Sequence, residues 1–229
     1  VKVTGTPTVR AVEMPRNGAD LSVTGCAYEE VVNPAIYDEA IQSALDAGDF
    51  SSKKIVVGFS GRSTLIQNIA VSAERAKDLD MAVLEEAEKY IPYDIDEAQI
   101  DYYVHEGEPE QQTKVILAAV RQSDIDDKLE LLFSAGITPV RIDIELFALA
   151  NGFETANVGG FFQAEGEPAA LVDFGATKTL ITVTDGVNHV FREFPFGGHK
   201  LTELVAPRMG CQMEQAEAPK VDPGNNPAV

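Results

Sequence analysis

The spacing of apolar residues predicts strands at the start of the chain and a helix after them. Val9–Met14 and Leu21–Val31 alternate apolar and polar residues, as strands do, and Asn17-Gly18 between them favours a hairpin turn. Pro34 then opens a segment with helical spacing that Gly48 ends. Its apolar stripe consists of Ile36, Ala40, Ile41, Ala44 and Leu45. These elements predict antiparallel strands followed by a helix.

Two apolar runs follow that helix and predict buried strands at Lys54–Phe59 and Leu65–Val71. Beyond them the pattern predicts a small α+β subdomain over residues 72–142. A Glu-rich helix runs from Ser72 or Ala73 to about Tyr90, and Pro92 stops it. The remaining predicted elements are strands at 100–104 and 114–120, a helix at 123–135 and a strand at 138–143.

The last third of the chain predicts a second group of strands after a linker. A short helix covers 145–153, and the Gly-rich, polar segment 157–167 is the best candidate for a linker between lobes. A strand, a turn and a second strand follow over 169–184, and a helix is expected over 200–209. Residues 212–229 are rich in Pro, Gly and Asn, which predicts a disordered tail.

The strand–turn–strand segment carries the first candidate chemistry. Asp173 stands at the end of an apolar run, Gly175 follows in the turn, and Thr177 and Thr179 come directly after it. Glycine lets a backbone approach a phosphate closely, turn amides can bind the anion, and an Asp can hold a metal ion or its waters. An ordinary hairpin with Asp and Gly in its turn explains the same residues, and from this stretch alone it is the simpler interpretation.

Two further segments favour a phosphate site. Gly197-Gly198 precedes the helix expected at 200–209, and amides at a helix N-terminus bind anions. Near the start of the chain, Gly5-Thr6-Pro7-Thr8 lies between predicted strands, as the turn after Asp173 does. A duplicated unit of this kind suggests a cleft with one phosphate loop on each wall.

Charge and cysteine content exclude several classes of function. The chain of 229 residues carries 18 Lys and Arg against 37 Asp and Glu, a net charge of −19, so neither nucleic acid nor an anionic bilayer is an expected partner. Cys26 and Cys211 are far apart and no Cys-x-x-Cys occurs, which fits a reducing compartment and indicates no zinc site. The sequence shows no signal peptide and no apolar run long enough to span a membrane, so direct membrane insertion is not expected.

Several segments resemble the actin-like ATPases and, within them, the family of the type IV pilus assembly protein PilM, a relative of the division protein FtsA. The segments from Asp173 to Thr179 and from Phe196 to Thr202 resemble the second phosphate loop and the Gly-Gly segment after it, and Gly5–Met14 resembles the first phosphate loop with its strand. The most specific segment is Leu84–Tyr93, a Glu-rich helix that ends in Tyr-Ile-Pro-Tyr. Two more matching segments are Ala98–Asp101 and Ile137–Glu145.

The resemblance implies an α/β protein with actin-like (ribonuclease H-like) mixed-sheet lobes, an inserted α+β subdomain and an incomplete second lobe. The first lobe would comprise residues 1–71 and 143–157, the inserted subdomain 72–142 and the start of the second lobe 165–211. PilM-like proteins clamp ATP and Mg²⁺ between their lobes. They bind the short N-terminal peptide of the membrane protein PilN in a groove between the first lobe and the inserted subdomain, and so couple the assembly platform to the cytoplasmic motor ATPase.

The resemblance also supplies the candidate residues and a localisation. The phosphate-binding candidates are Gly5, Thr6, Thr8, Asp173, Gly175, Thr177, Thr179, Gly197 and Gly198, with Asp173 as the candidate Mg²⁺ ligand and no catalytic residue assigned. Two features depart from the family pattern: Val3 stands where the first phosphate loop usually has Asp, and residues 210–229 lack the glycine-rich adenosine segment. We therefore expect impaired ATP binding in a cytoplasmic protein held at the inner membrane through its partners.

Three alternatives stay open at this point. The chain could be an active ATPase or a sugar-kinase-type enzyme, for which Mg-ATP turnover lost on Asp173→Ala would be the sign. It could be an FtsA-like division protein, which should carry an amphipathic membrane helix at its C-terminus. It could also be an α/β interaction module without a ligand site, and self-association is open in every case.

Overall fold

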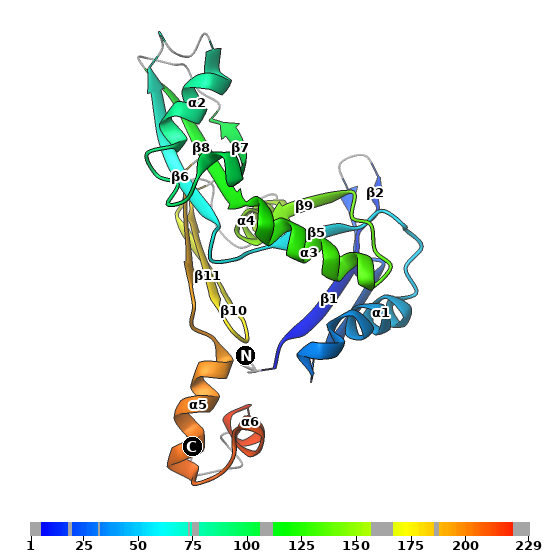
Figure 1. Ribbon diagram of the computed structural model, residues 1–229. Coiled ribbons are helices and arrows are strands. Elements are labelled where there is room, and N and C mark those ends of the chain that lie inside the picture. The colour runs from blue at the N-terminus through cyan, green and yellow to red at the C-terminus, as the bar shows by residue number, and fades with distance from the viewer. Residues whose placement is uncertain are drawn as a thin grey trace. The chain divides into compact units, whose positions relative to one another are not determined.

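The computed structural model describes residues 6–17, 20–31, 33–72, 74, 78–105, 112–156, 167–185 and 188–221. These residues form two compact units, one comprising 1–58 with 131–229 and the other comprising 59–130. The elements of both units are coloured along the chain in Figure 1. None of the described helices is long and apolar enough to cross a membrane.

The first unit begins with the predicted antiparallel strands. β1 (Thr8–Glu13) pairs with β4 (Gly25–Glu30), with Val9 opposite Glu29 and Val12 opposite Cys26. Between them, β2 (Arg16–Asn17) and β3 (Asp20–Leu21) pair antiparallel, which confirms the predicted hairpin, although Gly18 lies outside the described residues.

Helix α1 (Tyr37–Gly48) follows a single 3₁₀ turn at Pro34–Ile36, and it ends at the predicted glycine. The Asn33 side chain caps the 3₁₀ turn by accepting a hydrogen bond from the Ala35 amide at 3.0 Å. The helix lies beside β1 in Figure 1 and packs on both β1 and β4. Its apolar stripe buries Ile41 in a cluster with Leu132, Ala135 and Ile137. This cluster joins residues more than eighty positions apart in the sequence. It therefore holds together the two chain segments, 1–58 and 131–229, that form this unit.

In the described residues, the rest of the first unit contains two further sheets, one of which is covered by a helix. β5 (Val56–Phe59) neighbours β9 (Arg141–Ile144), and α4 (Glu145–Ala156) follows β9 directly. β10 (Ala169–Phe174), β11 (Thr179–Thr184) and β12 (His189–Phe194) form an antiparallel sheet in that order. Helix α4 packs on this sheet, where the fully buried Thr182 hydroxyl donates to the Leu146 carbonyl at 3.4 Å.

The second unit is a three-stranded antiparallel sheet with a helix over one face. β6 (Leu65–Ser72), β8 (Gln112–Arg121) and β7 (Ala98–Val104) are neighbours in that order, and α2 (Leu79–Ala87) lies next to them in Figure 1. The core between helix and sheet consists of Ile69, Val71, Ala82, Val83, Ala87, Ile91, Val115, Leu117 and Ala119. Helix α3 (Gln122–Ser134) leads from this unit back to the first and ends before Gly136, whose φ is +72°.

The Tyr90-Ile-Pro-Tyr93 segment is the part of the second unit that the sequence singled out. Ile91 is buried in the core, and the Tyr93 hydroxyl donates to the Ser63 carbonyl at 3.1 Å. The Arg121 guanidinium lies over the Tyr93 ring, with its carbon 4.6 Å from the ring centroid. Ser63 also donates its hydroxyl hydrogen bond to Asp124. The segment thus ties the end of α2 to the loop before β6 and to the end of β8.

Three observations differ from the sequence predictions. Helix α2 begins at Leu79, where the Asp78 side chain caps it, and not at Ser72 or Ala73. β6 pairs with β8 from Leu65 to Ser72, so the compact unit starts at Phe59 while the predicted subdomain starts at 72. Residues 213–221 form α6 (Met213–Val221), so the predicted disordered tail is wrong for them. The division into lobes and inserted subdomain stays a prediction.

Candidate functional site

The turn after Asp173 is the part of the predicted phosphate site that the structure describes best. β10 and β11 pair antiparallel up to Phe174 opposite Thr179, and the four residues between them make the turn. The Gly175 amide donates to the Lys178 carbonyl at 2.9 Å, which closes the turn. Asp173 and Thr177 are exposed beside it. A carboxylate and a hydroxyl are therefore available to an incoming ligand at this turn.

The turn lies directly against the start of α5 (Gly198–Met209). The Gly198 amide donates to the Gly175 carbonyl at 2.9 Å, and the His199 amide donates to the Ala176 carbonyl at 2.7 Å. The buried Thr179 hydroxyl donates to the Phe196 carbonyl at 2.6 Å. The structure thus brings Gly175 and Thr179 together with Gly197 and Gly198, and their role in phosphate binding stays a prediction.

This contact changes which groups could bind an anion. The sequence assigned that role to the amides at the start of α5, because the first turn of a helix leaves its N–H groups without partners. Here the amides of Gly198 and His199 already donate to carbonyls of the turn. A phosphate would therefore be bound by other groups of the turn, such as the Thr177 hydroxyl, and not by these two amides. Asp173 could take part only through a bound cation, because a carboxylate repels a phosphate.

Gly197 has no room for a side chain. A Cβ atom on this residue would lie 2.5 Å from the Gly175 oxygen and 2.6 Å from the Ala176 oxygen, closer than non-bonded atoms approach. Both obstacles are backbone atoms, so rotation of a side chain cannot relieve the clash. The close approach of the turn to α5 thus depends on glycine at this position.

The first predicted phosphate loop is only partly described. Thr8 begins β1, Thr6 precedes it, and both are half-buried, whereas Gly5 and Val3 lie outside the described residues. The Pro7 carbonyl between the two threonines accepts a hydrogen bond from the Val31 amide at 2.8 Å. The role of Gly5, Thr6 and Thr8 as the opposite wall of a cleft stays a prediction.

A charged cluster beside the second turn was missed by the sequence analysis. Lys178, in the turn, forms an ion pair of 2.9 Å with Glu145, the first residue of α4. Glu193 on β12 belongs to the same cluster. Burial raises the pKa of its carboxyl, the positive charge of Lys178 lowers that pKa, and the negative charge of Glu145 raises it. Glu145 also packs on Gly58, where an added Cβ would come within 2.9 Å of its Cγ. No local pattern links residues 58, 145, 178 and 193, so only the fold could identify them as neighbours.

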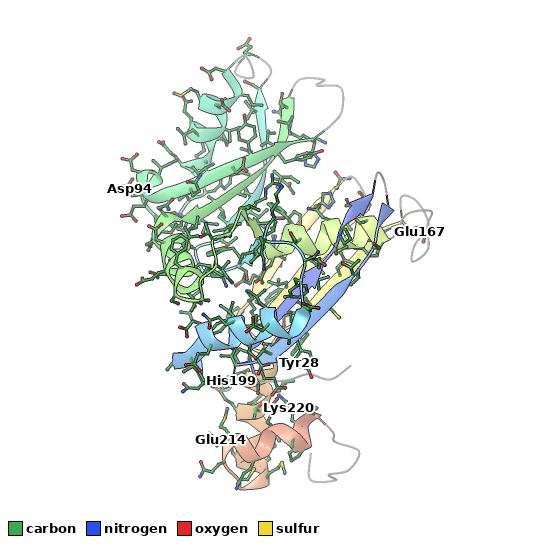
Figure 2. The ribbon with its side chains drawn as sticks, turned by 90° about the vertical axis from the view of Figure 1, so that its right-hand side faces the viewer. Tyr28, Asp94, Glu167, His199, Glu214 and Lys220 are labelled. Atoms are coloured by element: carbon green, nitrogen blue, oxygen red, sulfur yellow. The ribbon has the colours of Figure 1, made fainter. Side chains whose placement is uncertain are left out.

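A second missed group lies between α5 and α6. The Lys220 ammonium, only 5% exposed, donates to the Gly198 carbonyl at 3.0 Å, the Thr202 hydroxyl at 2.9 Å and Glu217 at 2.7 Å. The buried Thr202 hydroxyl in turn donates to Glu217 at 2.7 Å. Figure 2 labels Lys220 and His199, which come from α6 and from the start of α5. The signal in the sequence was Glu217 and Lys220, which stand three residues apart, as partners on one helix face do.

The candidate Mg²⁺ ligand is a single exposed carboxylate, that of Asp173. In the described segments, no three His, Cys, Asp or Glu side chains gather closely enough to hold a metal ion. Asp173 would therefore bind Mg²⁺ only together with phosphate and water oxygens, which is how this ion is usually held.

Comparison with known proteins assigns the fold to the actin-like class, a mixed α/β architecture. A solved structure described as the "PilM-PilN type IV pilus biogenesis complex" is 24% identical with a TM-score of 0.80, and the match covers 98% of this chain and 70% of that one. The cytoplasmic domain of EpsL, an inner-membrane component of the type II secretion system of Vibrio cholerae, is 13% identical with a TM-score of 0.50, over 86% of this chain and 70% of that one.

The model of the family "Type IV pilus assembly protein PilM" matches residues 5–227. The chain belongs to this family. The resemblance inferred from the sequence is thereby confirmed, and so is the predicted fold class, whereas the incompleteness of the second lobe stays a prediction.

Replacing Gly197 with alanine should separate the turn from α5. The new Cβ would clash with two backbone oxygens, so we expect a clear loss of stability and faster hydrogen exchange of the Gly198 and His199 amides. Gly152→Ala is the matched control, because no described atom lies within 4 Å of its added Cβ and α4 should gain roughly 0.5–1 kcal/mol. Equal exchange rates at these two amides in Gly197→Ala and wild type would contradict the proposed contact.

Replacing Glu193 with glutamine should stabilise the protein at neutral pH. The pKa of Glu193 is raised in the folded state, so its contribution to stability is present below its unfolded-state pKa and is lost as pH rises through its folded-state pKa. We expect the melting temperature of Glu193→Gln to lie above that of wild type at pH 7. The difference should vanish as the pH falls below the pKa range of carboxyl groups. A melting temperature that falls at pH 7 would show instead that attraction to Lys178 outweighs burial.

Proposed function

We propose that the chain is a structural component of a type IV pilus assembly platform, or of a related secretion platform, at the cytoplasmic face of the inner membrane. In this role it binds the short N-terminal peptide of a PilN-type membrane protein, and through that partner it is held at the membrane. The observation that carries the proposal is the family match over residues 5–227, supported by the fold shared with the PilM–PilN complex. A contact with the pilus motor ATPase is part of the same proposal.

Charge supports a peptide partner over other ligands. The net charge of −19 favours extended segments with basic residues and disfavours nucleic acid and anionic lipid. The signature segment supports the same role in another way. Tyr93 of this segment contacts Ser63 and Arg121 within unit 59–130, so the most family-specific segment has a structural role, and no catalytic group is needed to explain it.

We infer that ATP binding is impaired. Two amides at the start of α5 are used by the turn, and Val3 stands where the resemblance expects the carboxylate of the first loop. The groups that would contact phosphate are those of the turn with the exposed Thr177 hydroxyl, and the exposed Asp173 would act through Mg²⁺. Loss of a carboxylate weakens the positioning of a metal ion and so reduces catalysis more than binding. A scaffold with a weak nucleotide site fits these residues better than an efficient ATPase.

Binding of a PilN-type peptide is the direct test of the scaffold proposal. We expect a synthetic N-terminal peptide of the PilN-type protein from the same organism to bind in calorimetry with a Kd on the order of micromolar. A peptide of the same composition in scrambled order should not bind, because specific binding depends on the order of the side chains along the peptide. If a sample that is folded by circular dichroism binds neither peptide, the proposed partner is wrong.

The nucleotide site can be tested in the same way. Mg-ATP should bind weakly, with a Kd well above the micromolar range, and Asp173→Ala should weaken it further because the exposed carboxylate is the only assigned magnesium ligand. Asp101→Ala, which removes an exposed carboxylate from β7 in the other unit, is the control. Identical affinity in the two variants would remove Asp173 from the site, and rapid turnover of ATP by wild type would favour the ATPase alternative.

A further inference from the structure

A cavity of about 210 Å³ lies between the end of β4 and the first turns of α1, within the first unit. It belongs neither to the phosphate turn nor to the cluster around Glu145. Its lining residues come from one continuous stretch of the chain: Glu29, Glu30, Val31, Asn33, Ile36, Glu39, Ala40 and Ser43.

The local fold explains why the cavity has an apolar floor and an acidic rim. Val31 and Ala40 are buried, with 3% and 8% exposed, whereas Glu30 and Glu39 are exposed around them. Ile36, Glu39, Ala40 and Ser43 follow the i, i+3, i+4, i+7 spacing, so they share one face at the start of α1. The capped 3₁₀ turn at Asn33 fixes the approach of the chain to that face.

The glutamates at the rim of the cavity form no ion pair with a described cationic side chain. Three glutamates line the cavity, and neither Lys, Arg nor His is among the lining residues. Glu29 accepts a hydrogen bond of 3.4 Å from the Ser43 hydroxyl, and no described ion pair involves Glu29, Glu30 or Glu39. A cationic group is therefore the electrostatic complement of this cavity.

The lining argues against a metal ion, and the volume argues against a drug-sized ligand. The glutamates are not gathered closely enough to hold a metal ion, as holds for every acidic group in the described part of the chain. A drug-sized ligand or cofactor needs a pocket of roughly 300–1,000 Å³. What remains is a single side chain with an apolar stem and a charged end, and Lys and Arg bury their stems on apolar surface while their charged ends stay at the rim.

The neighbouring strand is suited to carry such a side chain. β4 pairs with β1 on one side, and in the described residues no strand pairs with its other side. An extended segment can add to a free strand edge through main-chain hydrogen bonds, with pockets for alternate side chains. Tyr28, labelled in Figure 2, precedes the cavity residues on β4 and is 70% exposed, which offers such a segment an aromatic contact.

We propose that the cavity between β4 and α1 binds a lysine or arginine side chain carried by an extended segment of a partner protein. This interaction is additional to the PilN-type partner and does not rest on it. Electrostatic attraction brings the segment to the glutamate rim, and the apolar floor formed by Val31, Ile36 and Ala40 selects the aliphatic stem.

The test uses two blocked pentapeptides and the isotope-labelled chain. One peptide has the sequence Thr-Leu-Arg-Leu-Thr, and the other carries norleucine in place of arginine. We expect the arginine peptide to shift amide resonances of residues 29–43 in a saturable way and the norleucine peptide to leave them unchanged. Raising the ionic strength from about 0.05 M to about 0.5 M should weaken binding, because the Debye length shortens.

The double variant Glu30→Gln, Glu39→Gln removes two of the three glutamate charges that line the cavity, with little change of side-chain size. It should reduce the affinity for the arginine peptide about fivefold or more, as the loss of exposed charge pairs does. Glu214→Gln, at an exposed position at the start of α6, should bind as wild type does. PilN-type peptide binding should be the same in all three proteins, so failure of one proposal is distinguishable from failure of the other.

Three outcomes would overturn the inference. Equal shifts with both peptides would show an apolar groove without charge selection. Absence of shifts in residues 29–43 at millimolar arginine peptide would show that the cavity does not bind the side chain. Shifts that depend on protein concentration alone would show that a second copy of the chain occupies the cavity.

Discussion

The second half of the first unit depends on the backbone contact between the turn 175–176 and the start of α5. Two amides of α5 donate to two carbonyls of the turn, and no atom larger than hydrogen fits on Gly197 between them. Lys220 of α6 then donates to the Gly198 carbonyl and to the Thr202 hydroxyl, and so holds α6 to the first turns of α5. One close approach of two backbone segments thus positions a sheet, two helices and the candidate phosphate-binding residues.

The same contact limits the chemistry of the site. A helix start usually offers free amides to an anion, but here two of them satisfy the turn. The groups left for a phosphate are those of the turn with the exposed Thr177 hydroxyl, and the exposed Asp173 could take part only through a bound cation. This limit supports the proposal of a structural role in an assembly platform.

The two units differ in the features that bear on function. In unit 59–130 the residues of the family signature stabilise the fold. Ile91 lies in the core, and Tyr93 contacts Ser63 and Arg121. In the first unit the glutamates at the end of β4 surround an apolar floor and have no described cationic partner. Two peptide-binding surfaces on one chain would suit a protein that connects a membrane partner to other components of a platform.

The sequence alone determined the elements whose signals are local. Period-two and helical spacing located most strands and helices, glycine ended α1 at Gly48, and the Leu84–Tyr93 segment identified the family, because each signal lies within one short stretch. Only the tertiary structure decided the rest. It placed β6 with the sheet of unit 59–130, ordered residues 213–221 around the buried Lys220, and brought Glu145, Lys178 and Glu193 together. These outcomes depend on contacts between residues far apart in sequence, and periodicity and turn residues carry no information about such contacts.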